Sequence, residues 1–428
     1  MIKNTGFMAA STAVRLLSSM VLFIALARLY GPEEFGRFFY NFTLSTLFLL
    51  LLDYGFAPQM LREIGRDPAD VGRIMGRVLY ARLLLLLPML GLSALYFVAW
   101  PQRLPDLPIF GLLFLSAILA SFGEFFLVAF RGVGKFHEET KIATASSVLH
   151  FALLCGMASL GCSLLTLAAG FVVSRLVGMV WSWRALRRRV APIALRGHTP
   201  SSGLATLRTS FAYAVDAGFG SFFQQVDTLI INHYLGPASV GVYQAGMRFL
   251  QGAMQFSPVL ANVYLPAIAG QLNQREQLAK IAGKLNFQML GLGVAGWCGF
   301  ALLGGPVTAV LYGVKYQALT PLWPYIGLLM LLRYVAASQG VLLTATGSQS
   351  IRVWAQIVAL AVLLGSAPAL IAHFGLSGML MSLSLTAMAL LLLYTATLLL
   401  RNIPTGFSPG SGALAGCVLA AALFLLKT

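Results

Sequence analysis

Long apolar stretches separated by short polar loops run through the whole chain. A stretch of about 20 apolar residues is long enough to cross the hydrocarbon core of a membrane as a helix. On this criterion the sequence predicts twelve membrane-spanning helices, at 5–30, 36–60, 78–99, 109–131, 142–160, 163–184, 205–233, 238–268, 285–304, 320–345, 352–373 and 376–400. A shorter apolar run at 411–426 fits either a thirteenth span or an interfacial helix.

One turn sequence occurs twice, about half the chain length apart. Residues 29–36 read Leu-Tyr-Gly-Pro-Glu-Glu-Phe-Gly, and residues 234–241 read Tyr-Leu-Gly-Pro-Ala-Ser-Val-Gly. In each copy Gly-Pro follows a long apolar helix and is expected to break it, because proline removes a backbone donor and clashes with the preceding turn. Self-similarity at half length in a membrane protein predicts two repeated helical bundles with a substrate site between them.

The longest predicted loop lies between the two bundles. It contains three consecutive arginines, two prolines and a Ser-Ser-Gly run, a composition typical of a flexible linker. We therefore expect an N-terminal six-helix lobe at 1–185, a cytoplasmic linker at 186–204, a C-terminal six-helix lobe at 205–401 and a tail at 402–428.

Two local patterns predict how segments pack. Residues 61–77 mix arginines with isolated aliphatic residues, a pattern that fits either a short amphipathic surface helix or a solvated loop. Gly291, Ala295 and Gly299 recur at every fourth position, which predicts a flat helix face for close packing.

The composition excludes a soluble protein. The chain is 58% hydrophobic and only 10% charged, with a mean hydropathy of +0.83, which indicates an all-α polytopic membrane protein. The four cysteines have no metal-ligand spacing, and no Walker-type Gly-Lys-Ser/Thr loop is present. We therefore expect no metal site, no cofactor, no catalytic residue and no attached ATP-hydrolysing domain.

The distribution of Lys and Arg residues among the loops indicates how the chain is oriented in the membrane. The net charge is +16, and with the N-terminus in the cytoplasm almost all loop Lys and Arg residues fall on the cytoplasmic side. The opposite side holds Arg28, Arg37, Arg103 and Lys315. The lipid bilayer, with its anionic headgroups, is therefore the expected partner of these charges, and no nucleic acid is needed to explain them.

The residues around the first turn resemble a known family. The segment Ala27-Arg28-Leu29-Tyr30-Gly31-Pro32-Glu33-Glu34-Phe35-Gly36, then Asp53-Tyr54-Gly55 and Leu61-Arg62-Glu63-Ile64, is similar to the start of Wzx-type polysaccharide flippases. These belong to the multidrug/oligosaccharidyl-lipid/polysaccharide exporter superfamily. The turn Arg131-Gly132-Val133-Gly134-Lys135 is similar too.

The resemblance implies a transporter of the bacterial cytoplasmic membrane. It implies two lobes facing a central cleft, lined by the first two helices of each lobe. The implied cargo is an undecaprenyl-pyrophosphate-linked oligosaccharide, moved to the periplasmic leaflet by alternating access for polysaccharide biosynthesis. Polysaccharide polymerase machinery would then be a partner.

Ionisable residues inside the predicted spans are the candidate functional residues, because each costs about 2.5–3.5 kcal/mol at mid-helix. Arginine presents a planar fork of donors that matches phosphate oxygens and keeps its charge when desolvated. We therefore expect Arg15, Arg248 and Arg333 to bind pyrophosphate, with Gln224 and Gln225 on sugar hydroxyls. The alternative is that each arginine is neutralised by a carboxylate and only ties helices together, which we favour for Arg82 and Arg175.

The intramembrane carboxylates have two possible roles. Asp53, Glu124, Asp216 and Asp227 fit either coupling to an ion or proton, or structural pairing with arginine. Ion or proton coupling requires a buried carboxyl group, whereas structural pairing requires a neighbouring guanidinium.

Three functions compete at this stage. A lipid-linked oligosaccharide flippase needs basic groups for an anionic cargo, whereas a drug or cation antiporter of the same superfamily predicts a cleft dominated by carboxylates. A membrane-bound glycan polymerase or ligase predicts a sizeable periplasmic loop with catalytic groups. The basic residues within the spans at least match the acidic ones and the periplasmic loops are short, so the pattern favours the flippase and argues against an enzyme.

Overall fold

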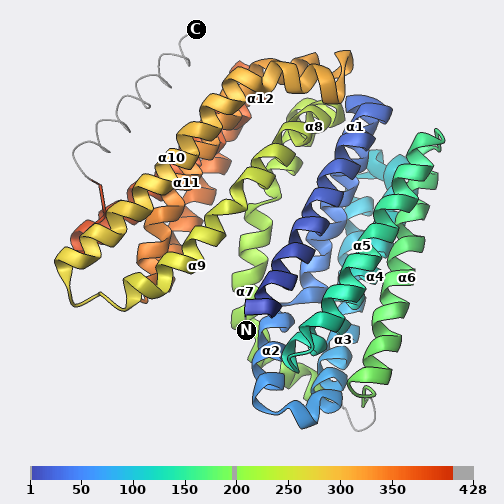
Figure 1. The fold of residues 1–428 in the computed structure, drawn as a ribbon. Helices are drawn as coiled ribbons and strands as arrows, with labels where there is room; N and C mark the ends of the chain where they lie inside the picture. Colours follow the sequence, from blue (N-terminus) through green and yellow to red (C-terminus); the bar gives the residue numbers. More distant parts are fainter. Residues whose placement is uncertain (1, 195–199, 408–428) are drawn as a thin grey trace. The chain divides into compact units, whose positions relative to one another are not determined.

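The computed structural model describes residues 2–194 and 200–407, which are helical with short connections and contain no strand (Figure 1). The all-α class predicted from the sequence is confirmed for these residues. Contacts divide the chain into two compact units, Met1–Asn232 and His233–Thr428. The run at 411–426 lies outside the described residues.

The first unit is a bundle in which α4 packs most extensively against α6, and α1 packs against α5. The helix α7 packs against α3, α1 and α2 and so belongs to this unit by its contacts. The elements are α1 (Ile2–Asp53), α2 (Phe56–Arg66), η1 (Pro68–Asp70), α3 (Val71–Ala99), η2 (Pro101–Asp106), α4 (Leu107–Gly132), α5 (Phe136–Ser159), α6 (Leu164–Arg189), α7 (Pro200–Phe223) and the start of α8 (Val226–Met254).

The second unit is arranged around α11, which packs against α10, α12 and α9. A buried part of this unit joins the end of α10 to the start of α11, where the Trp323 indole donates to Thr308 Oγ1 at 2.8 Å. The elements are the rest of α8, α9 (Phe256–Ala269), α10 (Arg275–Val307), η3 (Thr308–Tyr312), η4 (Val314–Leu322), α11 (Trp323–Ala345) and α12 (Gln349–Leu400).

The prediction that Gly291, Ala295 and Gly299 form a close-packing face of α10 is wrong within this unit. A Cβ added at Gly291 or Gly299 would meet no atom within 4 Å. The glycines that let helices approach lie on another face of the same region: a Cβ at Gly293 would come within 3.1 Å of the Leu331 backbone, and one at Gly304 would overlap Trp323.

Both copies of the Gly-Pro turn break their helix in the same way. Gly31 has φ 81° and ψ 174°, and Gly236 has φ 80° and ψ 179°, a region of backbone space that is essentially restricted to glycine. Ring contacts show that α1 folds back on itself here. Phe23 and Phe42 lie 6.0 Å apart between ring centroids, whereas a straight helix would separate them by about 28 Å.

A third reversal, which the repeated motif does not mark, lies at Gly375 in α12, where φ is 58° and ψ is −131°. The Ser366 and Ser382 hydroxyls on either side of it are 2.5 Å apart. The segments of α12 before and after Gly375 therefore pack against each other. Gly378 lies so close to the Leu370 carbonyl that an added Cβ would overlap it.

The described residues contain eight helical stretches long and apolar enough to cross a membrane. Two of them, Ser18–Arg66 and Ile351–Leu400, have 49 and 50 residues and contain the reversals at Gly31 and Gly375. Since about 20 residues suffice for one crossing, each of these two stretches is long enough for two. The helices α7, α8 and α9 are not among the eight, and α9 has only 14 residues.

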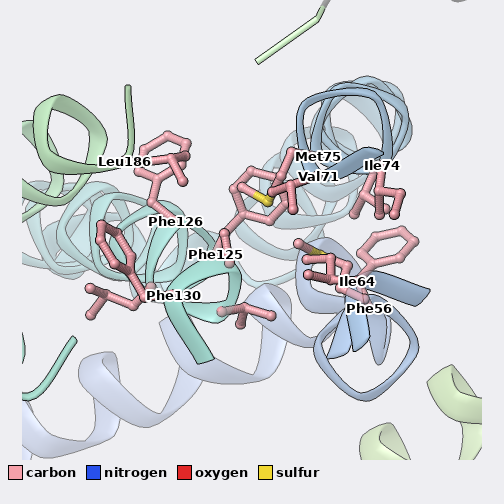
Figure 2. Close-up of a cluster of buried hydrophobic side chains, with 14 of the residues drawn as sticks. Phe56, Ile64, Val71, Ile74, Met75, Phe125, Phe126, Phe130 and Leu186 are labelled. Atoms are coloured by element: carbon pink, nitrogen blue, oxygen red, sulfur yellow. The ribbon is translucent and has the colours of Figure 1, made fainter. Parts of the chain in front are cut away.

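The single amphipathic helix or loop anticipated at residues 61–77 is not one element: the range covers the end of α2, η1 and the start of α3, and α2 is the short helix here. Its apolar face points into the protein, where Phe56 and Ile64 join Val71 and Met75 of α3 and Phe125 of α4 in a buried cluster (Figure 2). Gly132 lies against Ile64 closely enough that a Cβ would be 2.6 Å from it. This packing fixes the position of α2 next to the break that precedes it.

The turn geometry gives a direct stability prediction. Gly236→Ala places a side chain at φ 80° with no atom within 4 Å of the new Cβ, so the expected loss is the backbone strain alone, about 1–3 kcal/mol. Gly291→Ala, also in open space but helical, should change stability in the opposite direction by at most about 1 kcal/mol. Equilibrium unfolding of the purified protein in detergent measures both, and equal effects would contradict the assigned conformation.

Candidate functional site

A break in the backbone between α1 and α2 forms the centre of the candidate site. Tyr54 and Gly55 have φ of 41° and 65°, and α1 ends at Asp53 immediately before them. Gly55 lies so close to α7 that an added Cβ would be 2.5 Å from the Tyr213 carbonyl carbon. The break therefore leaves Asp53 at a helix end, facing the neighbouring helices of the bundle.

Asp53 holds a buried arginine from α3. Arg82 Nη2 lies 2.7 Å from Asp53 Oδ1, and the Ser121 hydroxyl of α4 donates to the same oxygen at 2.5 Å. Arg82 also donates to the Ser121 hydroxyl, and its guanidinium lies 5.1 and 5.0 Å from the ring centroids of Phe122 and Phe125. The Arg82 side chain is 3% exposed and that of Asp53 is 51% exposed, so Arg82 is buried while Asp53 remains accessible.

A second ion-paired group lies further along α4. Arg131 Nη2 lies 2.8 Å from Glu124 Oε2, and Arg131 Nε lies 3.2 Å from Glu139 Oε1 of α5. Glu124 is half exposed, whereas Glu139 is 9% exposed. The same arginine thus connects the end of α4 to the start of α5 and holds Glu124 in an ion pair.

A cavity of about 300 Å³, which we call the break cavity, lies between these two groups. It carries two arginines and two carboxylates, so the charges on its wall balance. Its polar lining residues are Asp53, Tyr54, Arg82, Ser121, Glu124, Arg131 and Ser221.

A second cavity of about 380 Å³ lies among α1, α4, α5 and α6, and we call it the serine cavity. His150 Nδ1 is 2.7 Å from the Ser174 hydroxyl, and Arg175 Nη2 is 3.5 Å from His150 Nε2. Glu124 lines both cavities. The α4 helix therefore separates the two cavities, and its Glu124 side chain lines both of them. The polar lining of the serine cavity comprises Ser18, Ser19, Glu124, Ser146, Ser147, His150, Ser174, Arg175 and Ser182.

The candidate residues Gln224, Gln225 and Asp227 lie at the break between α7 and α8. The Gln225 side chain accepts a hydrogen bond from Thr46 of α1 and donates to the Ser221 carbonyl at 3.3 Å. Asp227 is 5% exposed, and its Oδ1 accepts from the Thr228 backbone N–H at 2.6 Å. Gln224 is exposed. This second break thus lies in the same unit as the break at Asp53.

The arginines anticipated in the second half lie on two helices of the second unit. Arg248 of α8 is half buried and donates to Gln251 at 3.3 Å, and Arg333 is half buried midway along α11. The side chains of Arg15 and Asp216 lie outside the described residues. The pyrophosphate-binding roles of Arg15, Arg248 and Arg333 and the coupling or charge-pair role of Asp216 stay predictions.

Ser121 is the site residue that the sequence analysis left out, because a serine in an apolar helix carries little signal. Arg82 was expected to pair with a carboxylate, but the sequence did not identify which one. One usable signal existed: Ser121 and Glu124 are three residues apart and so share one face of an otherwise apolar helix. The preference for a paired Arg82 agrees with its contact to Asp53.

A matched pair of glycine variants tests the close approach at the break. Gly134→Ala introduces a side chain at φ 76° in open space, and should cost about 1 kcal/mol. Gly55→Ala adds a backbone collision with Tyr213 to the same strain, and should cost about 1–3 kcal/mol more. Thermal unfolding of both variants measures the difference, and similar stabilities would contradict the contact between the break and α7.

The comparisons with known proteins concern family and fold. The polysaccharide biosynthesis protein family matches residues 1–270 of the chain. No curated protein matches the sequence. A multidrug resistance MATE family transporter of the MOP superfamily, in an inward-facing conformation, shares 16% identity at a TM-score of 0.66, over 90% of this chain and 94% of that chain.

Two further solved structures show the same fold. The lipid II flippase MurJ, in an inward closed conformation, shares 14% identity at a TM-score of 0.71, over 93% of this chain and 87% of that chain. A MOP superfamily transporter from Pyrococcus furiosus shares 16% identity at a TM-score of 0.63, over 92% of this chain and 94% of that chain. The chain therefore has the fold of MOP superfamily transporters, which is not an enzyme fold.

Proposed function

Because the chain belongs to the polysaccharide biosynthesis protein family, we propose that it is a flippase for a lipid-linked oligosaccharide. The proposed cargo is an undecaprenyl-pyrophosphate-linked glycan, moved between the leaflets of the bacterial cytoplasmic membrane as in Wzx-type flippases of O-antigen and related polysaccharides. The observation that carries the proposal is the set of charged and hydroxyl side chains around two cavities inside a bundle of membrane-length helices. Such groups are costly in a membrane and are expected to serve transport.

The proposed architecture has two six-helix lobes. Splitting α1 at Gly31, α8 at Gly236 and α12 at Gly375, and joining α7 and α9 to the adjoining parts of α8, gives six crossings on each side of residues 186–204. Lobes of this kind expose a midplane site to one side of the membrane at a time. The basic loops support a cytoplasmic N-terminus.

The proposed pyrophosphate anchors are Arg15, Arg248 and Arg333, because a desolvated guanidinium binds phosphate oxygens bidentately. Gln224 and Gln225 are proposed to meet sugar hydroxyls. Among the candidate coupling groups Asp53, Glu124, Asp216 and Asp227, the ion pairs with Arg82 and Arg131 favour a charge-pair role for the first two.

A drug or cation antiporter remains the second candidate, because a multidrug transporter shares the fold. The balance of arginines and carboxylates in the break cavity supports the flippase instead, since a cation binder needs an excess of carboxylates.

Depletion of the protein in a strain whose surface glycan depends on it separates the two candidates. We expect surface glycan to fall while lipid-linked glycan accumulates inside the cell, because the polymerase machinery would receive no substrate on the periplasmic face. Unchanged surface glycan together with raised dye accumulation would support the antiporter and overturn the flippase.

A further inference from the structure

We propose that the serine cavity of the first unit is a subsite that binds one sugar residue of the transported glycan. The inference rests on the proposed flippase function and adds to it a location for sugar recognition. Its position is independent of how the two units are arranged, because every lining residue lies in α1, α4, α5 or α6.

The cavity is of a size and polarity that suit a small hydroxylated ligand. Its volume of about 380 Å³ falls in the range of small-molecule pockets, which is roughly 300–1,000 Å³. Six serines contribute hydroxyls that donate and accept hydrogen bonds, as sugar hydroxyls do. Ser146 Oγ is buried and has no hydrogen-bond partner among the described residues, and a buried polar atom of this kind is expected to meet a ligand or water.

The aromatic lining completes the requirements of a sugar ring. Phe23, Phe42, Phe151 and Phe171 line the cavity beside the serines. The C–H face of a pyranose packs on a phenyl ring, while its equatorial hydroxyls point sideways to polar groups. His150 and Ser174 are bonded to each other at 2.7 Å, and the His150 ring packs edge-on against Phe171 at 4.8 Å between centroids. The polar and aromatic walls are thus held in fixed positions.

Other ligand classes fit this lining less well. A metal ion is disfavoured because the described residues contain no cluster of three His, Cys, Asp or Glu side chains. A simple cation would face Arg175, and Glu124 is already paired with Arg131 at 2.8 Å. A lipid tail would leave the buried Ser146 hydroxyl without a partner and would place Arg175 and Glu124 against hydrocarbon, at a desolvation cost for each.

Glycan protection of an introduced cysteine tests the inference with a minimal change of side chain. In a variant with Cys155, Cys162, Cys298 and Cys417 replaced by Ala, Ser147→Cys places a thiol in the cavity, and Gly156→Cys places one on the exposed side of the same helix. The probe is the oligosaccharide released by mild acid from the host's own lipid-linked pool. We expect it to slow maleimide labelling at position 147 by about tenfold, the effect of one or two hydrogen bonds, and to leave position 156 unchanged.

A cavity-filling variant adds a second measurement. A Cβ at Gly178 would point towards Ser146, 3.4 Å from its Oγ, so Gly178→Leu fills the cavity between α5 and α6. Added to the Ser147→Cys protein, it should abolish protection, whereas Gly156→Leu should not. Equal labelling at position 147 with and without glycan, or protection that persists in Gly178→Leu, would overturn the subsite and leave a water-filled space.

The same preparations separate this inference from the proposed function. Transport of lipid-linked glycan without protection at position 147 would refute the subsite and keep the flippase. Protection without transport would keep the sugar site and refute the flippase.

Discussion

Asp53→Asn is expected to destabilise the protein by about 3 kcal/mol, the lower end of the cost of breaking a buried ion pair. The substitution preserves shape and hydrogen bonding but leaves the Arg82 charge without its counterion. Since Arg82 is 3% exposed, water cannot replace the carboxylate. Equilibrium unfolding of the purified protein, with the yield of folded protein from membranes as a second readout, measures the loss.

Two variants decide whether the loss comes from the unpaired charge. Arg82→Met should cost less than Asp53→Asn, about 1–2 kcal/mol, because the half-exposed Asp53 carboxylate can be hydrated once it is alone. The double variant Asp53→Asn/Arg82→Met should be more stable than the two single losses added together predict.

The matched control is Asp70→Asn, which removes an acid from an exposed pair with Arg73. It should change stability by less than about 1 kcal/mol. A wild-type stability for Asp53→Asn, or strict additivity in the double variant, would refute the coupling between Asp53 and Arg82.

Arg248→Ala is expected to lower transport about 10- to 150-fold, the equivalent of losing a charged hydrogen bond worth about 1.5–3 kcal/mol. The reason is the proposed contact between its guanidinium and the pyrophosphate of the cargo. Arg248→Lys should recover part of the activity, because an ammonium keeps the charge but lacks the planar fork. Surface glycan in a dependent strain, normalised to the amount of protein in the membrane, measures the effect.

Arg275→Ala is the control for a general loss of positive charge, because Arg275 is exposed at the start of α10. It should leave transport unchanged. Full activity of Arg248→Ala at normal protein levels would remove Arg248 from the mechanism and return it to a structural role on α8.

The sequence predicts the main features of the fold because they depend on periodicity and on backbone chemistry. Apolar runs mark the helices, and the two Gly-Pro motifs mark turns with nearly identical dihedral angles at Gly31 and Gly236. The reversal at Gly375 is less visible, because a single glycine without proline also occurs inside intact helices such as α10. The breaks after Asp53 and after Phe223 depend on contacts between α1, α2 and α7 that no local pattern encodes.

The candidate site was only partly predictable for a related physical reason. The cost of an intramembrane charge identifies Asp53, Glu124 and Asp227 as residues that need partners. It does not identify the partner, because Arg82 is far from Asp53 along the chain and meets it only through the packing of α3 and α4 on α1. The serine cavity was not predictable at all, since serines on four different helices become a site only when those helices are assembled.

Transport by the purified protein tests the central claim most directly. The protein would be reconstituted into liposomes that carry the host's undecaprenyl-pyrophosphate-linked oligosaccharide, and the fraction of glycan accessible to an external glycosidase would be followed with time, with protein-free liposomes as the reference. The account predicts that the protein makes glycan from the inner leaflet accessible and that Arg248→Ala slows this process. Ion gradients would be applied across the liposome membrane in either direction. If the glycosidase-accessible fraction of glycan never rises above that of protein-free liposomes under any of them, the proposed flippase function is contradicted.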